Sequence, residues 1–78
     1  MTLTDGKIGE EYIVERVELP LSLEKRMEAL GMTIASSVKL IHKKRNGTSV
    51  ILIRGTKFAI GRDVASNIHV KGSNISGK

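Results

Sequence analysis

The stretch SVKLIHKKRNGTSVILI, residues 37–53, decides the fold. It contains two runs rich in β-branched and other apolar residues, at 37–43 and 49–53, separated by a short polar segment. That segment includes Asn46-Gly47, a dipeptide that favours the two-residue type I′ hairpin turn. The stretch therefore predicts a β-hairpin, around which we expect the rest of the chain to assemble.

The segments on either side of this hairpin supply further short elements. Arg54-Gly55 predicts a tight connection directly after the second run. The other expected elements are, in chain order, a first strand within residues 10–19 that ends before Pro20, a strand at 56–60, one helical turn at 61–66 capped by Asp63, and a last strand at 67–70. Short strands joined mostly by hairpins predict a mainly β protein with one or two short helices. We expect its sheet of about five strands to curl into a small, nearly closed barrel, because curling removes exposed strand edges.

Residues 22–30 predict one short helix between the first strand and the hairpin. The apolar positions Leu23, Met27 and Leu30 follow the i, i+4, i+7 spacing of a single helical stripe, and Ser22 is a favourable N-cap residue. A helix of about two turns does not persist alone in water, so it must pack on an apolar surface. We expect it to plug one open end of the barrel.

This helix is expected to end at Gly31. Glycine adopts left-handed backbone conformations at little cost, so Gly31 predicts a Schellman ending in which Met32 contacts Met27. Such an ending would turn the chain directly into the next strand.

The chain is expected to form a single domain at residues 1–71, with Thr2 to Gly6 as a polar entry segment and residues 72–78 as a flexible polar tail. It contains no cysteine, which excludes disulfides and thiolate metal ligands, so packing must provide its stability. The sequence shows no signal-peptide pattern and no apolar run near the ~20 residues needed to cross a bilayer. We therefore expect a cytoplasmic protein without direct membrane insertion.

The net charge of +5 is distributed unevenly along the chain. Residues 1–28 contain seven acidic and four basic side chains, whereas residues 29–78 contain nine basic side chains and only Asp63 as an acid. One interpretation is that the two halves neutralise each other across the fold and that charge keeps the domain soluble. The other is a basic face for an acidic partner such as nucleic acid, a nucleotide, anionic lipid or an acidic protein.

The best candidate for such a face is the basic run at the hairpin tip. The candidate partner-binding residues are Lys43, Lys44 and Arg45 in this run, together with Lys57, Arg62 and Arg26. Proteins that bind single-stranded nucleic acid usually add aromatic side chains that stack on bases, and only Tyr12 and Phe58 are aromatic here. Nucleic acid is therefore the less favoured partner.

Patterns for metal binding and catalysis are weak. His42 and His69 are the only histidines, and Asp63 is a further candidate ligand; without thiolates, partly exposed strand histidines are the simpler interpretation. The serines have no base beside them, and the carboxylates form no acid–base pair on one element. We therefore expect no enzyme activity, no catalytic residues and no cofactor, with weak binding of a divalent metal such as Fe²⁺ as the alternative.

Two segments resemble the ferrous iron transport protein A family, FeoA. The first is RMEALGM at residues 26–32, and the second is RGTKFAIGRDVASNIHV at residues 54–70. The matching positions are Arg26, Met27, Leu30 and Gly31 in the helix, Gly55, Thr56, Phe58, Ala59 and Ile60 after the hairpin, and Ala65, Ile68 and Val70 near the end. The loop after the helix usually carries a Pro-Gly turn in this family, whereas this chain has Ile34-Ala35 there.

The resemblance implies a small cytoplasmic SH3-like barrel that works with FeoB, the membrane permease with a GTP-binding domain that imports Fe²⁺. It also implies that the motif residues are structural rather than catalytic, namely Leu23, Met27, Leu30, Gly31, Met32, Gly55, Thr56, Ala65 and Ile68. The expected function is an accessory, regulatory role in ferrous iron uptake through contact with the cytoplasmic GTP-binding part of FeoB. A metal-sensing module and, less favoured, a nucleic-acid-binding barrel are the alternatives.

Overall fold

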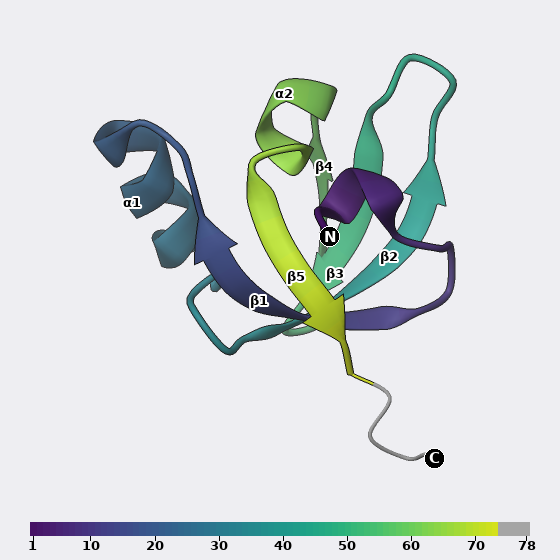
Figure 1. Ribbon diagram of the computed structural model, residues 1–78, viewed down its shortest axis with the longest axis horizontal. Helices are drawn as coiled ribbons and strands as arrows, with labels where there is room; N and C mark the ends of the chain where they lie inside the picture. Colours follow the sequence, from purple (N-terminus) through teal and green to yellow (C-terminus); the bar gives the residue numbers. More distant parts are fainter. Residues whose placement is uncertain (74–78) are drawn as a thin grey trace.

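The structure, a computed structural model, describes residues 1–73. Five strands and two short α-helices follow one 3₁₀ turn along the chain (Figure 1). In chain order the elements are η1 (Leu3–Asp5), β1 (Glu11–Val17), α1 (Leu21–Ala29), β2 (Ser37–Lys43), β3 (Ser49–Ile53), β4 (Thr56–Ile60), α2 (Arg62–Ala65) and β5 (Ile68–Gly72). The predicted mainly β architecture with short helices is confirmed.

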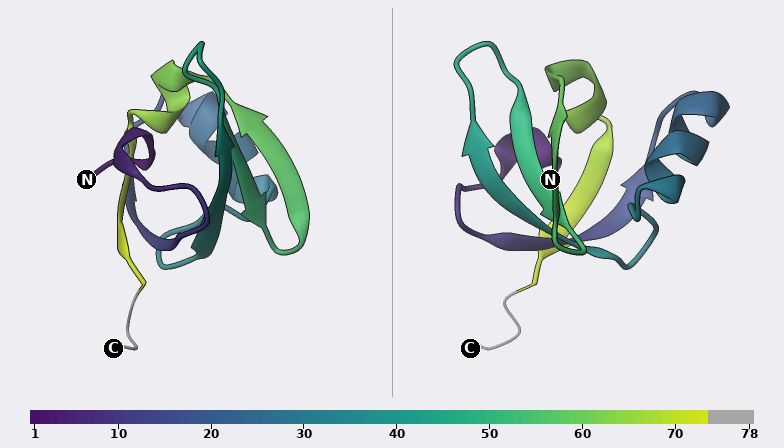
Figure 2. Two further views of the ribbon diagram at one scale, coloured as in Figure 1. Left: turned by 90° about the vertical axis from the view of Figure 1, so that its right-hand side faces the viewer. Right: turned by 180° about the vertical axis from the view of Figure 1, so that it is seen from behind.

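The strands form one antiparallel sheet in the order β4-β3-β2-β1-β5. Figure 2 shows that this sheet is strongly curved and wraps around its own inner face. β4 and β5 are its two edges, and no ladder joins them within residues 1–73. The barrel is therefore nearly closed, with its ends left for other segments to cover.

The inner face of the curved sheet holds a hydrophobic core. Most core residues come from alternate strand positions, as expected when one face of a sheet is buried. The core consists of Leu3, Tyr12, Val14, Met32, Val38, Leu40, Ile51, Ile53, Ile60, Ala65, Ile68 and Val70. Leu3, Met32 and Ala65 lie outside the strands and complete the core at its margins.

A bulge in β2 changes which of its residues face the core. Val38 and Leu40 point inward, so strict alternation would place residue 42 inside and residue 43 outside. The register instead shifts between Leu40 and His42, so that Lys43 pairs with the buried Ser49. The bulge therefore brings Lys43 to the mouth of the barrel and leaves His42 exposed.

The turn of the β2–β3 hairpin differs from the prediction, whereas the tight connection predicted at Arg54-Gly55 is confirmed. The β2–β3 hairpin lies where expected, but of the Asn46-Gly47 pair only the glycine has a positive φ, of +95°. The Gly47 N–H donates to the carbonyl of Lys44 at 3.0 Å, so the connection is a three-residue loop ending in a left-handed glycine. The type I′ prediction is therefore wrong at this turn. Two successive positive φ values, the type I′ pattern, occur instead between β3 and β4, at Arg54 (+52°) and Gly55 (+84°).

Helix α1 does not plug the barrel, contrary to the prediction. It lies beside the sheet (Figure 1), none of its residues is buried, and the adjoining Leu30 is 41% exposed. Of the predicted stripe, Met27 packs against the core. The predicted N-cap is also wrong, because the helix begins at Leu21 and Pro20, two residues before Ser22, occupies the N-cap position.

The predicted Schellman ending of this helix is confirmed. Gly31 has a φ of +106°, and its N–H donates to the carbonyl of Glu28 at 2.9 Å. The N–H of Met32 donates to the carbonyl of Met27, also at 2.9 Å. Met32 then enters the core, where it is 1% exposed.

Two other elements fill the end of the barrel that α1 leaves open. Leu3 of η1 and Ala65 of α2 are both fully buried, so the segment predicted as a polar entry supplies a core residue. Asp63 is not the cap of α2 as predicted; it lies inside the helix, and Gly61 occupies the N-cap position. β5 extends to Gly72, one residue beyond the predicted domain boundary, and residues 74–78 of the predicted tail lie outside the described residues.

The loop between α1 and β2 makes a tight turn at Ile34-Ala35. Ser36 N–H donates to the carbonyl of Thr33 at 2.9 Å, and Ala35 has a φ of +73°, the left-handed value that glycine usually takes at this position of a type II turn. The carbonyl of Val14 in β1 accepts the N–H of Ala35 at 2.7 Å, and the N–H of Val14 donates to the carbonyl of Ser36 at 2.9 Å. Hydrogen bonds to the sheet therefore hold an alanine in a strained conformation.

Candidate functional site

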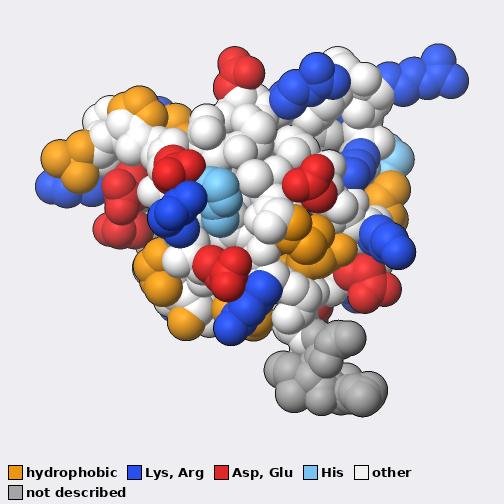
Figure 3. Space-filling model, in the orientation of Figure 1, with side chains coloured by type: hydrophobic (Ala, Val, Ile, Leu, Met, Phe, Trp, Pro, Cys, Tyr) orange, Lys and Arg blue, Asp and Glu red, His pale blue; other side chains and the backbone are white. Residues whose placement is uncertain are grey.

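A small hollow lies at the mouth of the barrel. Its lining residues are Thr4, Lys43, Gly47, Ser49 and Arg62, and its volume is about 210 Å³. These residues come from η1, β2, the hairpin loop, β3 and α2, so the fold brings together segments from both ends of the chain. Figure 3 shows Lys and Arg side chains gathered over this part of the molecule, at its upper right.

Lys43 is held at the hollow by its own hydrogen bond. Its Nζ donates to the backbone carbonyl of Thr4 at 2.9 Å, across 39 positions of sequence. An ammonium group has three donors, so this contact fixes the side chain and leaves donors for other groups. The bulge in β2 is the reason that this lysine, rather than His42, occupies the inner position.

The exposed Arg62 side chain lies close against the hairpin loop. A Cβ atom placed on Gly47 would lie 2.7 Å from Arg62 Nε and 3.0 Å from its Cβ, closer than van der Waals contact permits. Glycine at position 47 therefore serves both the left-handed turn and the approach of the arginine. Lys43 and Arg62 were both predicted as partner-binding residues, and both line this hollow. Lys44 and Arg45 follow Lys43 on the adjoining loop.

The charge of this cluster is only partly balanced by carboxylates. Among residues 1–73 the ion pairs are Arg16–Glu18 and His69–Glu18, so neither Lys43 nor Arg62 forms one. Asp5 senses the charge of Lys43: its pKa is lowered mainly by the hydrogen bond from the Thr2 backbone N–H, with a smaller contribution from Lys43. Asp63 is the chain neighbour of Arg62. The mouth of the barrel therefore carries Lys43 and Arg62 without an ion pair to either among residues 1–73.

The other predicted partner-binding cations lie elsewhere. Lys57 on β4 pairs with Leu52, which in turn pairs with Lys39, so Lys57 lies on the sheet away from the hairpin tip. Arg26 is exposed on α1. The structure therefore separates these two residues from the cluster around Lys43 and Arg62.

The α1 segment, residues 21–34, forms a second surface of interest. Three of the five large hydrophobic side chains that are exposed within residues 1–73 belong to it, namely Leu21 (66%), Leu30 (41%) and Ile34 (61%). This exposure could not be predicted from the sequence, because helical spacing indicates an apolar stripe but not whether another element covers it.

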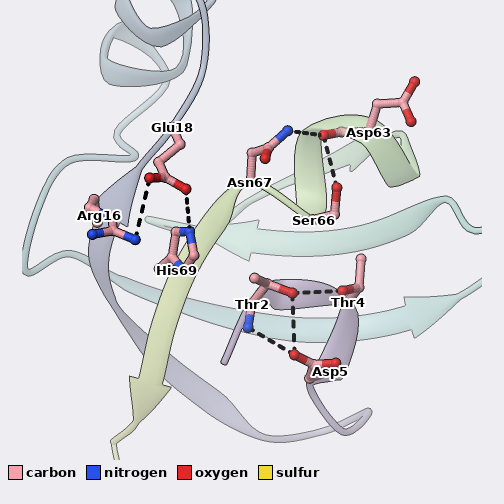
Figure 4. Close-up of polar contacts among 9 residues, drawn as sticks. All are labelled: Thr2, Thr4, Asp5, Arg16, Glu18, Asp63, Ser66, Asn67 and His69. Atoms are coloured by element: carbon pink, nitrogen blue, oxygen red, sulfur yellow. Dashed lines mark hydrogen bonds and ion pairs between the residues drawn. The ribbon is translucent and has the colours of Figure 1, made fainter.

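The predicted metal ligands are not brought together. His42 is on β2, Asp63 on α2 and His69 on β5, and β1 separates the two histidine strands. Within residues 1–73 there is no group of three or more His, Asp or Glu side chains placed to hold a metal ion. His69 instead pairs with Glu18, with 2.7 Å between Nε2 and Oε1 (Figure 4). This contact is the main cause of a lowered pKa for Glu18, with the charge of Arg16 second.

The helices within residues 1–73 are all too short to cross a membrane.

A curved five-stranded antiparallel sheet with two short helices defines a small SH3-like β-barrel domain. The FeoA domain matches residues 1–72, and the chain belongs to the FeoA family, whose members are non-enzymatic proteins associated with ferrous iron transport. It is 33% identical over 76 residues to the putative Fe(2+) transport protein A of Methanocaldococcus jannaschii, covering 97% of this chain and 92% of that protein. The family resemblance and the absence of enzyme function expected from the sequence are thereby confirmed.

Solved structures confirm the SH3-like fold. The FeoA protein from Chlorobium tepidum matches with a TM-score of 0.88 at 22% identity, covering 100% of this chain and 73% of that one. The manganese-activated repressor ScaR matches with a TM-score of 0.81 at 19% identity, covering 92% of this chain and 35% of the repressor. The barrel therefore occurs both as a separate chain and as one part of a larger regulator.

Proposed function

We propose that this chain is a cytoplasmic accessory and regulatory protein of ferrous iron uptake, which acts by binding the cytoplasmic GTP-binding part of a FeoB-type permease. Its family membership links it to ferrous iron transport. A module of this family performs no catalysis, so its effect on transport has to come from contact with another component. The proposal therefore depends on a surface that is suited to a protein partner.

The observation that carries the proposal is the uncovered α1 segment. None of the residues of α1 is buried, although a helix of nine residues is too short to be stable by its own hydrogen bonds. Leu21, Leu30 and Ile34 add exposed apolar area on the helix and on the loop that follows it. Exposed apolar surface concentrated on one element is typical of protein interaction sites, and we assign the permease contact to this segment.

The test is binding of the purified chain to the cytosolic portion of its cognate permease, measured by calorimetry with and without guanine nucleotide. Leu30→Gln and Ile34→Gln are expected to weaken binding about tenfold or more, because each places a polar group where an apolar contact forms. Ile8→Gln is the matched control, since Ile8 is 55% exposed and lies outside the α1 segment. All variants should keep the melting temperature of the parent.

Two results would contradict the proposal. One is no detectable binding to the cytosolic portion in any nucleotide state, together with unchanged iron uptake when the chain is deleted. The other is equal weakening by Ile8→Gln and Leu30→Gln, which would remove the α1 segment as the contact surface.

A further inference from the structure

The hollow at the barrel mouth is separate from the surface that we propose for permease binding. It lies between η1, the β2–β3 loop and α2, whereas the proposed permease contact is on residues 21–34. We infer that this hollow is a binding site for a phosphoryl anion, held by Lys43 and Arg62.

Lys43 is preorganised at the hollow, and the Arg62 side chain lies against the neighbouring loop. Lys43 Nζ is fixed by the Thr4 carbonyl at 2.9 Å, and the Arg62 side chain is packed against the backbone of Gly47. Long cationic side chains normally lose much rotamer freedom when they bind a ligand, and that cost is lower when the protein already orders them. A surface cluster of unrestrained lysines would lack this property.

Several kinds of hydrogen-bond donor line the hollow. Arg62 offers a planar fork of N–H groups, Lys43 offers the donors that Thr4 does not use, and Ser49 adds a hydroxyl from the inner side of β3. Gly47 has no side chain, so its backbone can be approached closely. A tetrahedral anion with several terminal oxygens can use donors from these different directions, whereas a carboxylate presents only two oxygens in one plane.

The positive charge and the small volume of the hollow also fit a phosphoryl group. Neither Lys43 nor Arg62 has a carboxylate partner within residues 1–73, and Lys44 and Arg45 on the adjoining loop add further positive potential. A hollow of about 210 Å³ accommodates a single phosphoryl group rather than a large ligand. The group can be carried by free phosphate, by a nucleotide or by a lipid headgroup, and the hollow recognises the chemistry they share.

The experiment is a ¹H–¹⁵N NMR titration of the full chain with sodium phosphate, with ionic strength held constant by sodium chloride. We expect saturable shifts confined to the amides of Thr4, Lys43, Gly47, Ser49 and Arg62 and to the Arg62 Nε–H signal. Arg62→Gln and Lys43→Gln are expected to weaken binding about tenfold or more, because each removes a charged donor. Lys57→Gln is the control, since it removes the same charge from a different part of the sheet.

Parallel titrations identify the source of the group. GTP and GDP test nucleotides, and vesicles of phosphatidylcholine with and without phosphatidylglycerol test lipid headgroups. If GTP, GDP or the phosphatidylglycerol vesicles bind more tightly than phosphate through the same residues, the inference is supported and that molecule carries the phosphoryl group. If only phosphate saturates the site, the ligand is free phosphate.

The inference is overturned by diffuse shifts that do not saturate, by equal saturable binding of acetate, or by an unchanged affinity in Arg62→Gln. The parent chain and its variants are compared by melting temperature, so that loss of folding is recognised. Because these titrations contain no permease, and because Leu30→Gln should leave phosphate binding unchanged, the phosphoryl site and the proposed permease contact can fail separately.

Discussion

The N–H of Met32 donates to the carbonyl of Met27 at 2.9 Å, across the left-handed residue Gly31, and this bond turns the chain out of α1 and into the core. Met32 is buried at 1% exposure, whereas none of the residues of α1 is buried. The helix is therefore attached to the barrel by its ending more than by its faces. The same ending explains why a short, exposed helix keeps a defined position.

Gly31→Ala is expected to destabilise the protein by about 1–2 kcal/mol or more. The φ of +106° disfavours a β-carbon, and that carbon would lie 3.0 Å from Ile53 Cγ2 in the core. The measurement is urea unfolding followed by circular dichroism. Gly72→Ala is the control, because its φ is not in the left-handed range and no atom lies within 4 Å of the added carbon. Equal stability of Gly31→Ala and the parent would refute the role assigned to this turn.

Ala35→Gly is expected to stabilise the protein by about 0.5–1 kcal/mol. The native φ of +73° strains alanine but not glycine, and this gain exceeds the extra chain entropy of glycine in the unfolded state. For a domain of this size, 1 kcal/mol corresponds to a rise in melting temperature of about 4–8 °C. Ala29→Gly, within α1, should have the opposite sign because glycine is unfavourable in a helix. A lower melting temperature for Ala35→Gly would show that the turn is not strained.

Leu30→Ala and Ile51→Ala are expected to differ clearly in cost. Ile51 is fully buried in the core, so its truncation should cost roughly 2–5 kcal/mol through lost transfer energy and a residual cavity. Leu30 is 41% exposed, so its truncation should cost less than about 1 kcal/mol. Chemical denaturation measures the free energy of unfolding of each variant. Similar costs would indicate that Leu30 is buried and that the helix plugs the barrel, contrary to the structure.

Stability is expected to fall with acid below about pH 4.5. The hydrogen bond to His69 and the charge of Arg16 lower the pKa of Glu18 from its ordinary value of 4.5, and the Thr2 backbone lowers that of Asp5 from 3.8. A carboxylate with a lowered folded-state pKa contributes stability above its unfolded-state pKa, which is lost as the pH falls through the folded-state value. Glu18→Gln should therefore make the acid-side decline shallower. Identical pH profiles for the variant and the parent, measured by thermal melting, would contradict this account.

Much of the sheet could be predicted because its signals are local. The bounds of β2 and β3 agree with the predicted strands at residues 37–43 and 49–53, since alternation and turn residues act over a few positions. The turn geometry was less predictable, because Asn46-Gly47 is compatible with more than one hairpin loop. The Lys44–Gly47 hydrogen bond belongs to the three-residue form, and the bulge next to it helps to set the register.

Only some residues of the candidate site could be predicted from the sequence. Lys43 and Arg62 were candidates because they are cations, but Thr4, Gly47 and Ser49 carry no pattern that predicts their meeting. Leu3 was missed as a core residue because a single apolar side chain among polar ones gives no periodicity. Each of these positions is determined by contacts between segments that lie far apart along the chain.

The sequence by itself determined the hairpin, the helix and its glycine ending, because each depends on the conformational preferences of adjacent residues. Only the tertiary structure decided that Leu3 and Ala65, not α1, close the barrel, and that a bulge brings Lys43 to the hollow that Arg62 also lines. The physical reason is that one extra residue in a strand reverses the face of every residue after it. That choice depends on the pairing partner rather than on the strand's own composition.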